Sequence, residues 1–138
     1  NNGVGLICGW NGTILRTKDY GSEWSVTPNF TKNYLKCIES SESGNIIAAG
    51  GKGEIFLSRD IGISWSKINS GVDIPLEDIF FKGKSGFIAG SKGVILGSED
   101  NGETWRRLKF DRYNNITSIS GFGKHLYLSG SDGLLIKF

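Results

Sequence analysis

Short apolar runs of about five residues recur along the chain, and glycine-rich polar turns separate them. In one unit the runs cover residues 76–81, 87–89, 94–96 and 104–108. Glycine, Asn and Asp occupy the intervals, where they favour tight turns because they tolerate positive φ. No segment keeps the i, i+3, i+4 apolar spacing of an amphipathic helix. The pattern therefore predicts four short strands per unit and an all-β fold.

The unit repeats with a period of about 40 residues. A Gly-x-x-Gly motif occurs four times, and its second glycines are Gly12, Gly53, Gly93 and Gly133. An Asp-x-Gly-x-x-Trp motif follows three of these copies in the same register, and an isoleucine precedes the last three: Ile38, Ile79 and Ile119. Four-stranded meanders at this period are typical of β-propeller blades. We expect a single domain over residues 1–138, with units at approximately 1–33, 34–75, 76–115 and 116–138.

Two segments, 58–65 and 98–105, fit the pattern Ser-x-Asp-x-Gly-x-Thr-Trp, with Ser64 in place of Thr in the first. A third copy has Thr17 and Glu23 at the Ser and Thr positions. These segments resemble Asp-box (BNR) repeats, which occur in sialidases, sortilin-type receptors and the photosystem II assembly/stability factor family. The Gly-x-x-Gly-x-Ile ahead of the box is most similar to the last family. The resemblance implies a β-propeller of four-stranded antiparallel blades, about 3.5 of them in this chain.

The strand count leaves the two ends incomplete. If the strands of a blade are lettered A to D from the inside outward, the chain reads B-C-D, then two complete blades, then A-B-C. Open sheet edges favour pairing with further strands. Three alternatives stay open: part of a longer propeller, a small four-bladed ring, or association with copies of itself. The absence of Met, even at position 1, favours the first and predicts a processed or excised segment.

The Asp-box residues are interpreted as structural. Each Asp accepts hydrogen bonds from its own turn, each Gly takes a positive φ, and each Trp packs between neighbouring sheets. A calcium loop would need several oxygen ligands close together, which favours the structural interpretation. The residues concerned are Asp19, Gly21, Trp24, Asp60, Gly62, Trp65, Asp100, Gly102 and Trp105.

Charge and composition exclude several classes of protein. The formal net charge of +2 is too small for a typical nucleic-acid-binding protein, and no apolar run is long enough to span a membrane. Two cysteines and one histidine exclude a Cys/His metal cluster, so we expect no metal and no cofactor. A Cys8–Cys37 disulfide stays open, because adjacent blades would bring their strands near each other.

The sequence does not predict an enzyme. The sialidases require three arginines that grip a carboxylate, together with a Tyr–Glu pair and an acid. Here Arg16 and Arg59 lie beside Asp boxes, and Arg106 and Arg107 directly follow one. A retaining glycosidase also needs a paired acid and nucleophile, and no such pair is identifiable. We therefore expect no catalytic residues.

The loops are the expected binding surface, because binding residues commonly lie on loops of a rigid scaffold. The B–C turns and the D–A loops share one face of a propeller, and their residues vary between repeats. Aromatic and cationic residues in these loops are typical of interface anchors. The alternative is solvated loops whose aromatics cover blade ends. The candidate binding residues are Trp10, Phe30, Lys32, Tyr34, Lys52, Lys92, Arg112 and Tyr113.

The expected function is that of a non-enzymatic scaffold whose partner is another protein or peptide segment with acidic character. The resemblance implies an extracytoplasmic assembly or stability factor for a membrane-protein complex. One alternative is a carbohydrate-binding or sialidase-like module of a surface protein. A second alternative is an architectural repeat segment of a larger surface or virion protein.

Overall fold

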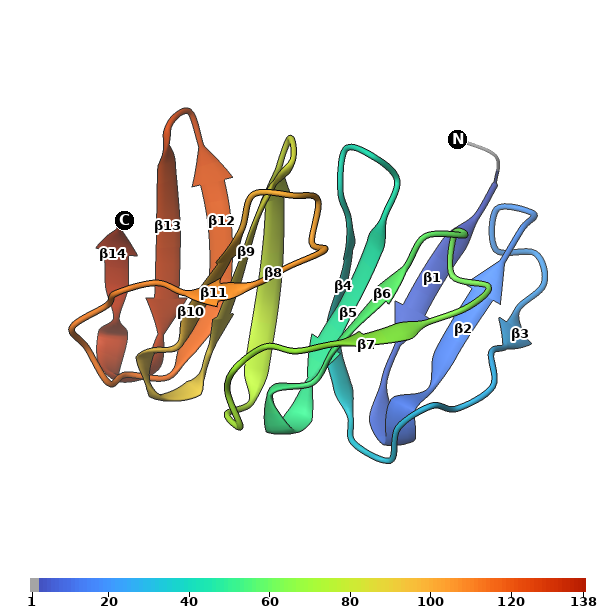
Figure 1. Cartoon of the computed structure of the whole chain (residues 1–138), viewed down its shortest axis with the longest axis horizontal. Coiled ribbons are helices and arrows are strands. Elements are labelled where there is room, and N and C mark those ends of the chain that lie inside the picture. The colour runs from blue at the N-terminus through green and yellow to red at the C-terminus, as the bar shows by residue number, and fades with distance from the viewer. Residues whose placement is uncertain (1–2) are drawn as a thin grey trace.

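The computed structural model describes residues 3–138, which form fourteen strands in four antiparallel sheets (Figure 1). The first sheet contains β1 (Gly5–Cys8), β2 (Ile14–Thr17) and β3 (Ser25–Val26). The second contains β4 (Leu35–Ser40), β5 (Ile46–Gly50), β6 (Ile55–Ser58) and β7 (Ser66–Ile68). The third contains β8 (Leu76–Lys82), β9 (Ser85–Gly90), β10 (Ile95–Ser98) and β11 (Arg106–Arg107). The fourth contains β12 (Ile116–Phe122), β13 (His125–Gly130) and β14 (Leu135–Lys137).

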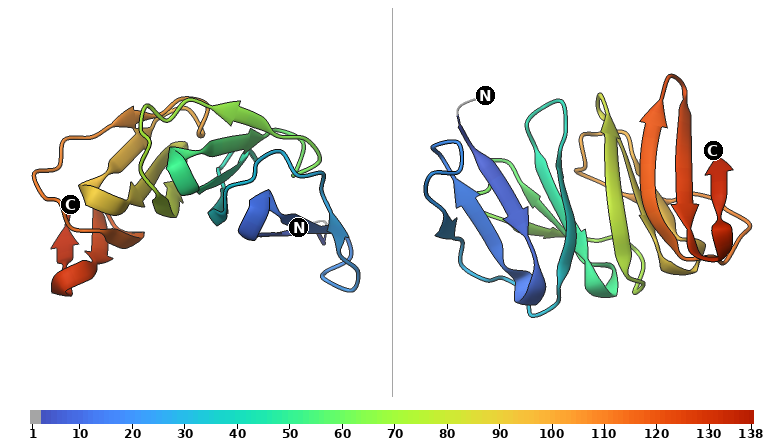
Figure 2. Two further views of the ribbon diagram at one scale, coloured as in Figure 1. Left: turned by 90° about the horizontal axis from the view of Figure 1, so that it is seen from below. Right: turned by 180° about the vertical axis from the view of Figure 1, so that it is seen from behind.

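Each sheet is a meander of consecutive strands, as expected for propeller blades, and the all-β prediction is confirmed. The four sheets follow one another along an open arc, with the first and last sheets at its two ends (Figure 2). Inner strands β4 and β8 contact each other, as do β8 and β12. Within residues 3–138, β1 has no inner neighbour and β14 has no outer one. The strand count made from the sequence is therefore correct at both ends.

Apolar side chains fill the space between each pair of adjacent sheets. The largest cluster joins the second and third sheets and includes Ile47, Leu57, Ile88 and Leu96. A second cluster joins the third and fourth sheets around Leu128. The smallest joins the first and second sheets. Every sheet is thus stabilised by burying apolar area against its neighbours.

Each inner strand has a bulge at its start, and the bulge of β8 also ties neighbouring sheets together. The register shifts between Leu76 and Asp78, and it shifts at the corresponding place in β4 and β12. At this bulge the Asp78 carboxylate accepts hydrogen bonds from the Ile119 backbone N–H at 2.9 Å and from the Ser118 hydroxyl at 2.8 Å. The third sheet is therefore fixed to the fourth by polar contacts as well as by packing.

The turn between the third and fourth strands of the second sheet is held by one carboxylate and one hydroxyl. Asp60 Oδ1 accepts hydrogen bonds from the Ser64 N–H and the Ser58 hydroxyl, both at 2.8 Å. Ser58 Oγ accepts one from the Gly62 N–H, also at 2.8 Å. These hydrogen bonds, chiefly those from Ser64, lower the pKa of Asp60 to about 2. Ile61 has φ 57°, a conformation that is costly for a β-branched residue and that the turn imposes.

The tryptophans of these turns differ in burial. Trp105 is buried, and its ring lies 6.1 Å from that of Phe81, edge to face. Trp65 packs against the first sheet through Phe30. Trp24, in contrast, is exposed, so the expectation that it packs between two sheets is wrong. The physical reason is that no described sheet precedes its own.

Both cysteines are free thiols, so the structure contains no Cys8–Cys37 disulfide. Burial raises the pKa of Cys8 to about 11 and also raises the pKa of Cys37, as expected for inert packed thiols. In residues 3–138, no group of three His, Cys, Asp or Glu side chains is arranged to hold a metal ion. The short helices of the same region lack the length and apolar character to cross a membrane.

Candidate functional site

Four 3-10 helices lie at one end of the sheets, along the lower edge of Figure 1. They are η1 (Trp10–Gly12), η2 (Gly51–Gly53), η3 (Ser91–Gly93) and η4 (Ser131–Gly133). The middle residue of each has a left-handed backbone with φ between 53° and 57°: Asn11, Lys52, Lys92 and Asp132. The loops that join successive sheets lie beside these turns, and we call turns and loops together the loop face.

The first and third loops between sheets are hydrogen-bonded to the turns on both sides of them. The first loop donates from Asn29 Nδ2 to the Asn11 carbonyl at 3.1 Å, and its Tyr34 carbonyl accepts from Gly51 at 3.0 Å. The third loop makes the same kind of bridge through its Asn114 and Asn115 carbonyls. A rigid loop face loses little conformational entropy when it binds a partner.

Glycine is required where the loops approach the turns. A Cβ on Gly93 would lie 1.8 Å from the Arg112 carbonyl oxygen, and one on Gly53 would lie 2.1 Å from that of Val72. Both glycines also have positive φ. The Gly-x-x-Gly motif of the sequence is therefore the device that seats each loop against its turn.

Two of the predicted binding residues form an aromatic pair. The ring centroids of Trp10 and Tyr34 lie 5.6 Å apart at an interplanar angle of 56°. Trp10 projects from η1 and is 77% exposed, whereas Tyr34 lies against Gly51 of the next turn. Tyr113, on the third loop, is also exposed. The structure thus joins Trp10 to Tyr34 and places Tyr113 on a different loop.

Phe30, a predicted binding residue, packs inward and is not an exposed anchor. Its ring packs against Phe56 at 4.6 Å and Trp65 at 5.8 Å, in the core between the first two sheets. The first loop turns its apolar residue inward because the Trp65 side chain offers an apolar surface there. Phe30 therefore fits the alternative interpretation, in which a loop aromatic covers the end of a blade.

A depression of about 550 Å³ opens on the loop face beside this loop. It is lined by Asn11, Asn29, Phe30, Thr31 and Lys32. Sequence reasoning selected Phe30 and Lys32 but missed the two asparagines and the threonine. Polar residues in turns are too common in this sequence to be distinguished without the fold.

The predicted cations lie on the loop face and are exposed: Lys32, Lys52, Lys92 and Arg112. No salt bridge involves any of them within the described part of the chain, whereas Lys67 and Arg106 of the outer strands pair with Glu54 and Glu99. Asn11 and Asp132 occupy the corresponding positions of the two end turns. Among the turns, the unpaired positive charge therefore lies on η2 and η3 of the two middle sheets.

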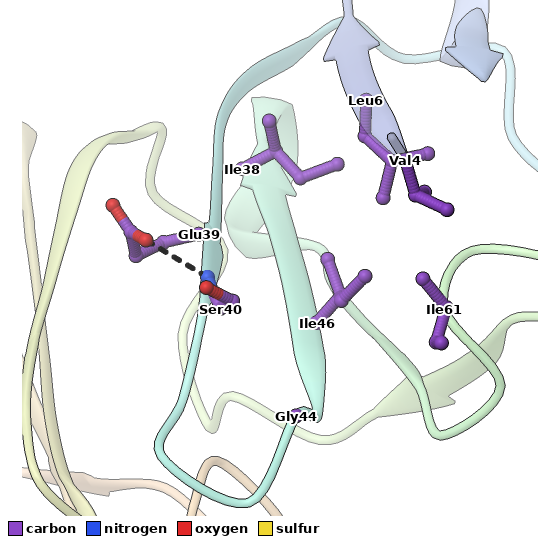
Figure 3. Close-up of a pocket in the computed structure, with 8 residues that line it drawn as sticks. All are labelled: Val4, Leu6, Ile38, Glu39, Ser40, Gly44, Ile46 and Ile61. Atoms are coloured by element: carbon purple, nitrogen blue, oxygen red, sulfur yellow. Dashed lines mark hydrogen bonds between the residues drawn. The ribbon is translucent and has the colours of Figure 1, made fainter. Parts of the chain in front are cut away.

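A second pocket lies away from the loop face, between β1 and β4 (Figure 3). Its volume is about 430 Å³, and Val4, Leu6, Ile38, Ile46 and Ile61 supply its apolar lining. Sequence reasoning did not select these residues. The signal that could have found them is the missing inner strand of the first unit, which leaves Leu6 and Ile38 uncovered.

No protein-family model matches the chain, and no curated protein sequence does so either. Solved structures do match. An ancestral GH74 enzyme superimposes with a TM-score of 0.82 at 16% identity, over 99% of this chain and 21% of that one. YCF48 from Cyanidioschyzon merolae superimposes with a TM-score of 0.75 at 20% identity, over 93% of this chain and 44% of that one.

A structure of YCF48 bound to D1 peptide also matches, with a TM-score of 0.68 at 18% identity, over 100% of this chain and 61% of that one. The chain therefore spans between 21% and 61% of the length of these proteins. At such identities the likeness concerns the fold. The chain is built like part of a larger propeller, and the expected structural resemblance to the photosystem II assembly factor YCF48 is confirmed.

Proposed function

We propose that this chain is a non-enzymatic scaffold whose loop face binds an extended, acidic segment of another protein. The observation that carries the proposal is Trp10, a large aromatic side chain that is 77% exposed on a rigid turn. The other turns have Gly51, Ser91 or Ser131 at this position, so the turn itself does not require a tryptophan. Exposed tryptophans of this kind are frequent binding anchors, because they bury much apolar area at little entropic cost.

The unpaired cations of the middle turns support an acidic partner. Lys52 and Lys92 are held at equivalent left-handed positions of neighbouring turns, so their spacing is set by the fold. Exposed charges of this kind accelerate association and select partners of opposite sign, and their effect falls with ionic strength. An extended segment that crosses η2 and η3 would place its carboxylates near both lysines and an apolar residue near Trp10.

The Asp-box carboxylates support a structural role in preference to a catalytic one. A general acid needs a pKa near the working pH, but hydrogen bonds from Ser64 and Ser58 lower the pKa of Asp60 to about 2. Asp60 Oδ1 and Oδ2 are occupied by the N–H and hydroxyl groups of their own turn. These carboxylates hold the hairpins and are poor proton donors at neutral pH.

A propeller of similar fold supplies a precedent, since YCF48 has been solved bound to D1 peptide. By analogy, we propose that this chain acts as an assembly or stability factor that holds a segment of a membrane-protein subunit. The extracytoplasmic location expected from the resemblance belongs to the same proposal. Fold analogy alone does not determine function, and the loop-face residues must therefore carry the test.

Selection of short unstructured peptides from a display library on the immobilised chain tests the proposal. We expect acidic peptides with one large apolar residue to be enriched. Trp10→Ala should weaken their binding about 30-fold, the effect of losing roughly 2 kcal/mol from a central anchor. A Lys52→Glu/Lys92→Glu variant should also bind more weakly, and its affinity should vary less with salt. Lys124→Glu, in the hairpin at the opposite end of β12 and β13, is the matched charge-reversal control.

Two outcomes would contradict the proposal. Selected peptides that bind Trp10→Ala and the double-lysine variant as well as wild type would place the binding site elsewhere. Binding of oligosaccharides that depends on Trp10 but not on the lysines would replace the protein scaffold with a carbohydrate-binding module. Circular dichroism spectra of all variants should match that of wild type, since the substituted side chains are exposed.

A further inference from the structure

Gly9, which directly follows β1, has different surroundings from the equivalent glycines of the other sheets. Those equivalents are Gly50, Gly90 and Gly130. A Cβ on them would lie 2.1, 2.4 and 2.0 Å from a carbonyl oxygen just before the inner strand, that of Tyr34, Pro75 and Asn115 respectively. Around Gly9, a Cβ would meet nothing within 4 Å. Gly9 therefore occupies a position at which the other sheets need a glycine to make room for a carbonyl oxygen, but no described residue places a carbonyl oxygen there.

An apolar residue of β1 is exposed where its equivalents are buried. Ile7 is 51% exposed. In the other sheets the equivalent residue is opposite an isoleucine of the inner strand and is 0% exposed: Ala48, Ile88 and Leu128. In those three sheets the position packs against the preceding sheet and has the isoleucine of the inner strand beside it on the same face. The first sheet has neither of these neighbours within residues 3–138.

The pocket between β1 and β4 lies beside the same edge. Figure 3 shows Leu6 and Val4 on one side of it, Ile38 and Ile46 on the other, and Ile61 at its end. Ile38 is only partly buried, whereas Ile79 and Ile119, its equivalents in β8 and β12, are in the core. The apolar pocket of about 430 Å³ therefore adjoins the open edge of the first sheet.

We propose that the inner edge of β1, with the pocket between β1 and β4, is a strand-docking site for an extended segment that carries the inner-strand pattern of this repeat. The chain itself defines that pattern as Leu/Ile-x-x-Ile, in residues 35–38, 76–79 and 116–119. The first apolar residue of the segment pairs with Gly9 and the second with Ile7, as in the other sheets. The carbonyl before the pattern lies over the Cα of Gly9.

The chemistry of recognition follows from strand addition. Main-chain hydrogen bonds to the edge of β1 supply much of the affinity, and apolar side chains at alternating positions supply register. The second isoleucine of the pattern lies beside Ile7, on the face that points away from the pocket. The residue before it turns to the other face, toward Ile38, as Cys37 does toward Ile79 in the next sheet. This site lies away from the cations and Trp10 of the loop face, and it selects by apolar pattern and not by charge.

A labelled peptide with the sequence of residues 114–122 tests the proposal by fluorescence anisotropy with the 138-residue chain. The control peptide has the same composition but exchanges Thr117 with Ile119, so that its two isoleucines are adjacent and lie on opposite faces of a strand. We expect the first peptide to bind and the control to bind at least about tenfold more weakly. Hydrogen exchange at Leu6–Cys8 should slow when the first peptide binds.

Gly9→Ala is the decisive variant. The added methyl meets nothing within 4 Å in the chain alone, so the unfolding midpoint should not change. It should nevertheless weaken peptide binding at least about tenfold, because it occupies the place of the docked carbonyl. The Lys52→Glu/Lys92→Glu variant should bind this peptide as wild type does, which separates this site from the loop face.

Three results would overturn the proposal: no binding of the first peptide, equal binding of the control peptide, or equal binding by Gly9→Ala. Failure of the loop-face experiment leaves this test unaffected, because the two experiments use different peptides and different variants.

Discussion

The two middle sheets and the two end sheets are made from one repeat, yet they bury equivalent residues differently. Leu135 of β14 is 77% exposed, whereas Ile14, Ile55 and Ile95 at the same repeat position are 0% exposed. The hairpin turns, in contrast, keep the hydrogen bond from a backbone N–H to the Asp carboxylate in the first sheet as in the middle ones. Local turn chemistry is thus complete within each unit, while burial depends on the neighbouring sheet, as in other repeat proteins.

The largest expected difference between the middle sheets and the end sheets is in the free energy that a core side chain contributes to folding. Ile88→Ala should lower the free energy of unfolding by about 2–5 kcal/mol, because Ile88 is fully buried and the cavity cannot refill. Ile7→Ala, at the equivalent position of the first sheet, should cost less than about 1 kcal/mol, because half of its side chain is already in water. Urea unfolding of both variants measures the difference, and equal losses would contradict the comparison.

A smaller effect is expected from the turn hydroxyl of the second sheet. Ser58→Ala should cost about 1–3 kcal/mol, because it leaves the Gly62 N–H without an acceptor in a buried place. Ser66→Ala, on the exposed strand β7, is the control and should have little effect. Urea unfolding checks both. A loss at Ser66 as large as at Ser58 would show that the turn network is not what the substitution removes.

The two tryptophans of the middle sheets allow a finer comparison. Trp105 Nε1 donates to the Gly102 carbonyl at 3.0 Å, whereas Trp65 Nε1 is buried with no acceptor among the described residues. Trp105→Phe should therefore cost about 1 kcal/mol more than Trp65→Phe, which removes an unsatisfied donor. Thermal unfolding of the two variants gives the ranking. The reverse order would indicate that ring volume, and not hydrogen bonding, dominates.

The smallest effect should come from titration of the turn carboxylates. The pKa of Asp60 is about 2 in the folded chain, against 3.8 as its usual value, so its hydrogen bonds stabilise the fold above pH 4 and are lost as the pH falls toward 2. The pKa of Asp19 is also lowered by hydrogen bonds, of which the one from the Thr17 hydroxyl has the largest effect. Carboxyl NMR titration should show both shifts, and Ser64→Ala should raise the pKa of Asp60. An unchanged pKa would contradict the assignment of Ser64 as its main donor.

Much of the fold follows from the sequence because the signals are local and repeated. Gly12, Gly53 and Gly93 mark turns that neighbouring residues enforce, and the shared period fixes the strand order and the incomplete ends. The inward turn of Phe30 was not predictable, since it depends on the apolar surface of Phe56 and Trp65 in the next sheet.

Of the candidate site, the exposure of Trp10 followed from its departure from the repeat, and that of the lysines from their place in turns and loops. The pairing of Trp10 with Tyr34 needed the fold, because the two residues lie on a turn and a loop of different sheets. The pocket between β1 and β4 was missed because its residues are ordinary strand apolars in the sequence. Only their missing neighbour makes them a site.

Native-state hydrogen exchange of the 138-residue chain tests the central claim most directly, namely that neighbours and not local sequence decide burial. Amides of β9 should exchange only through global unfolding, whereas those of β1, which carries the same repeat positions, should exchange by local opening at least about a hundredfold faster. Equal protection of β1 and β9 would contradict the account, because the first sheet would then be stable without the strand that its residues are built to meet.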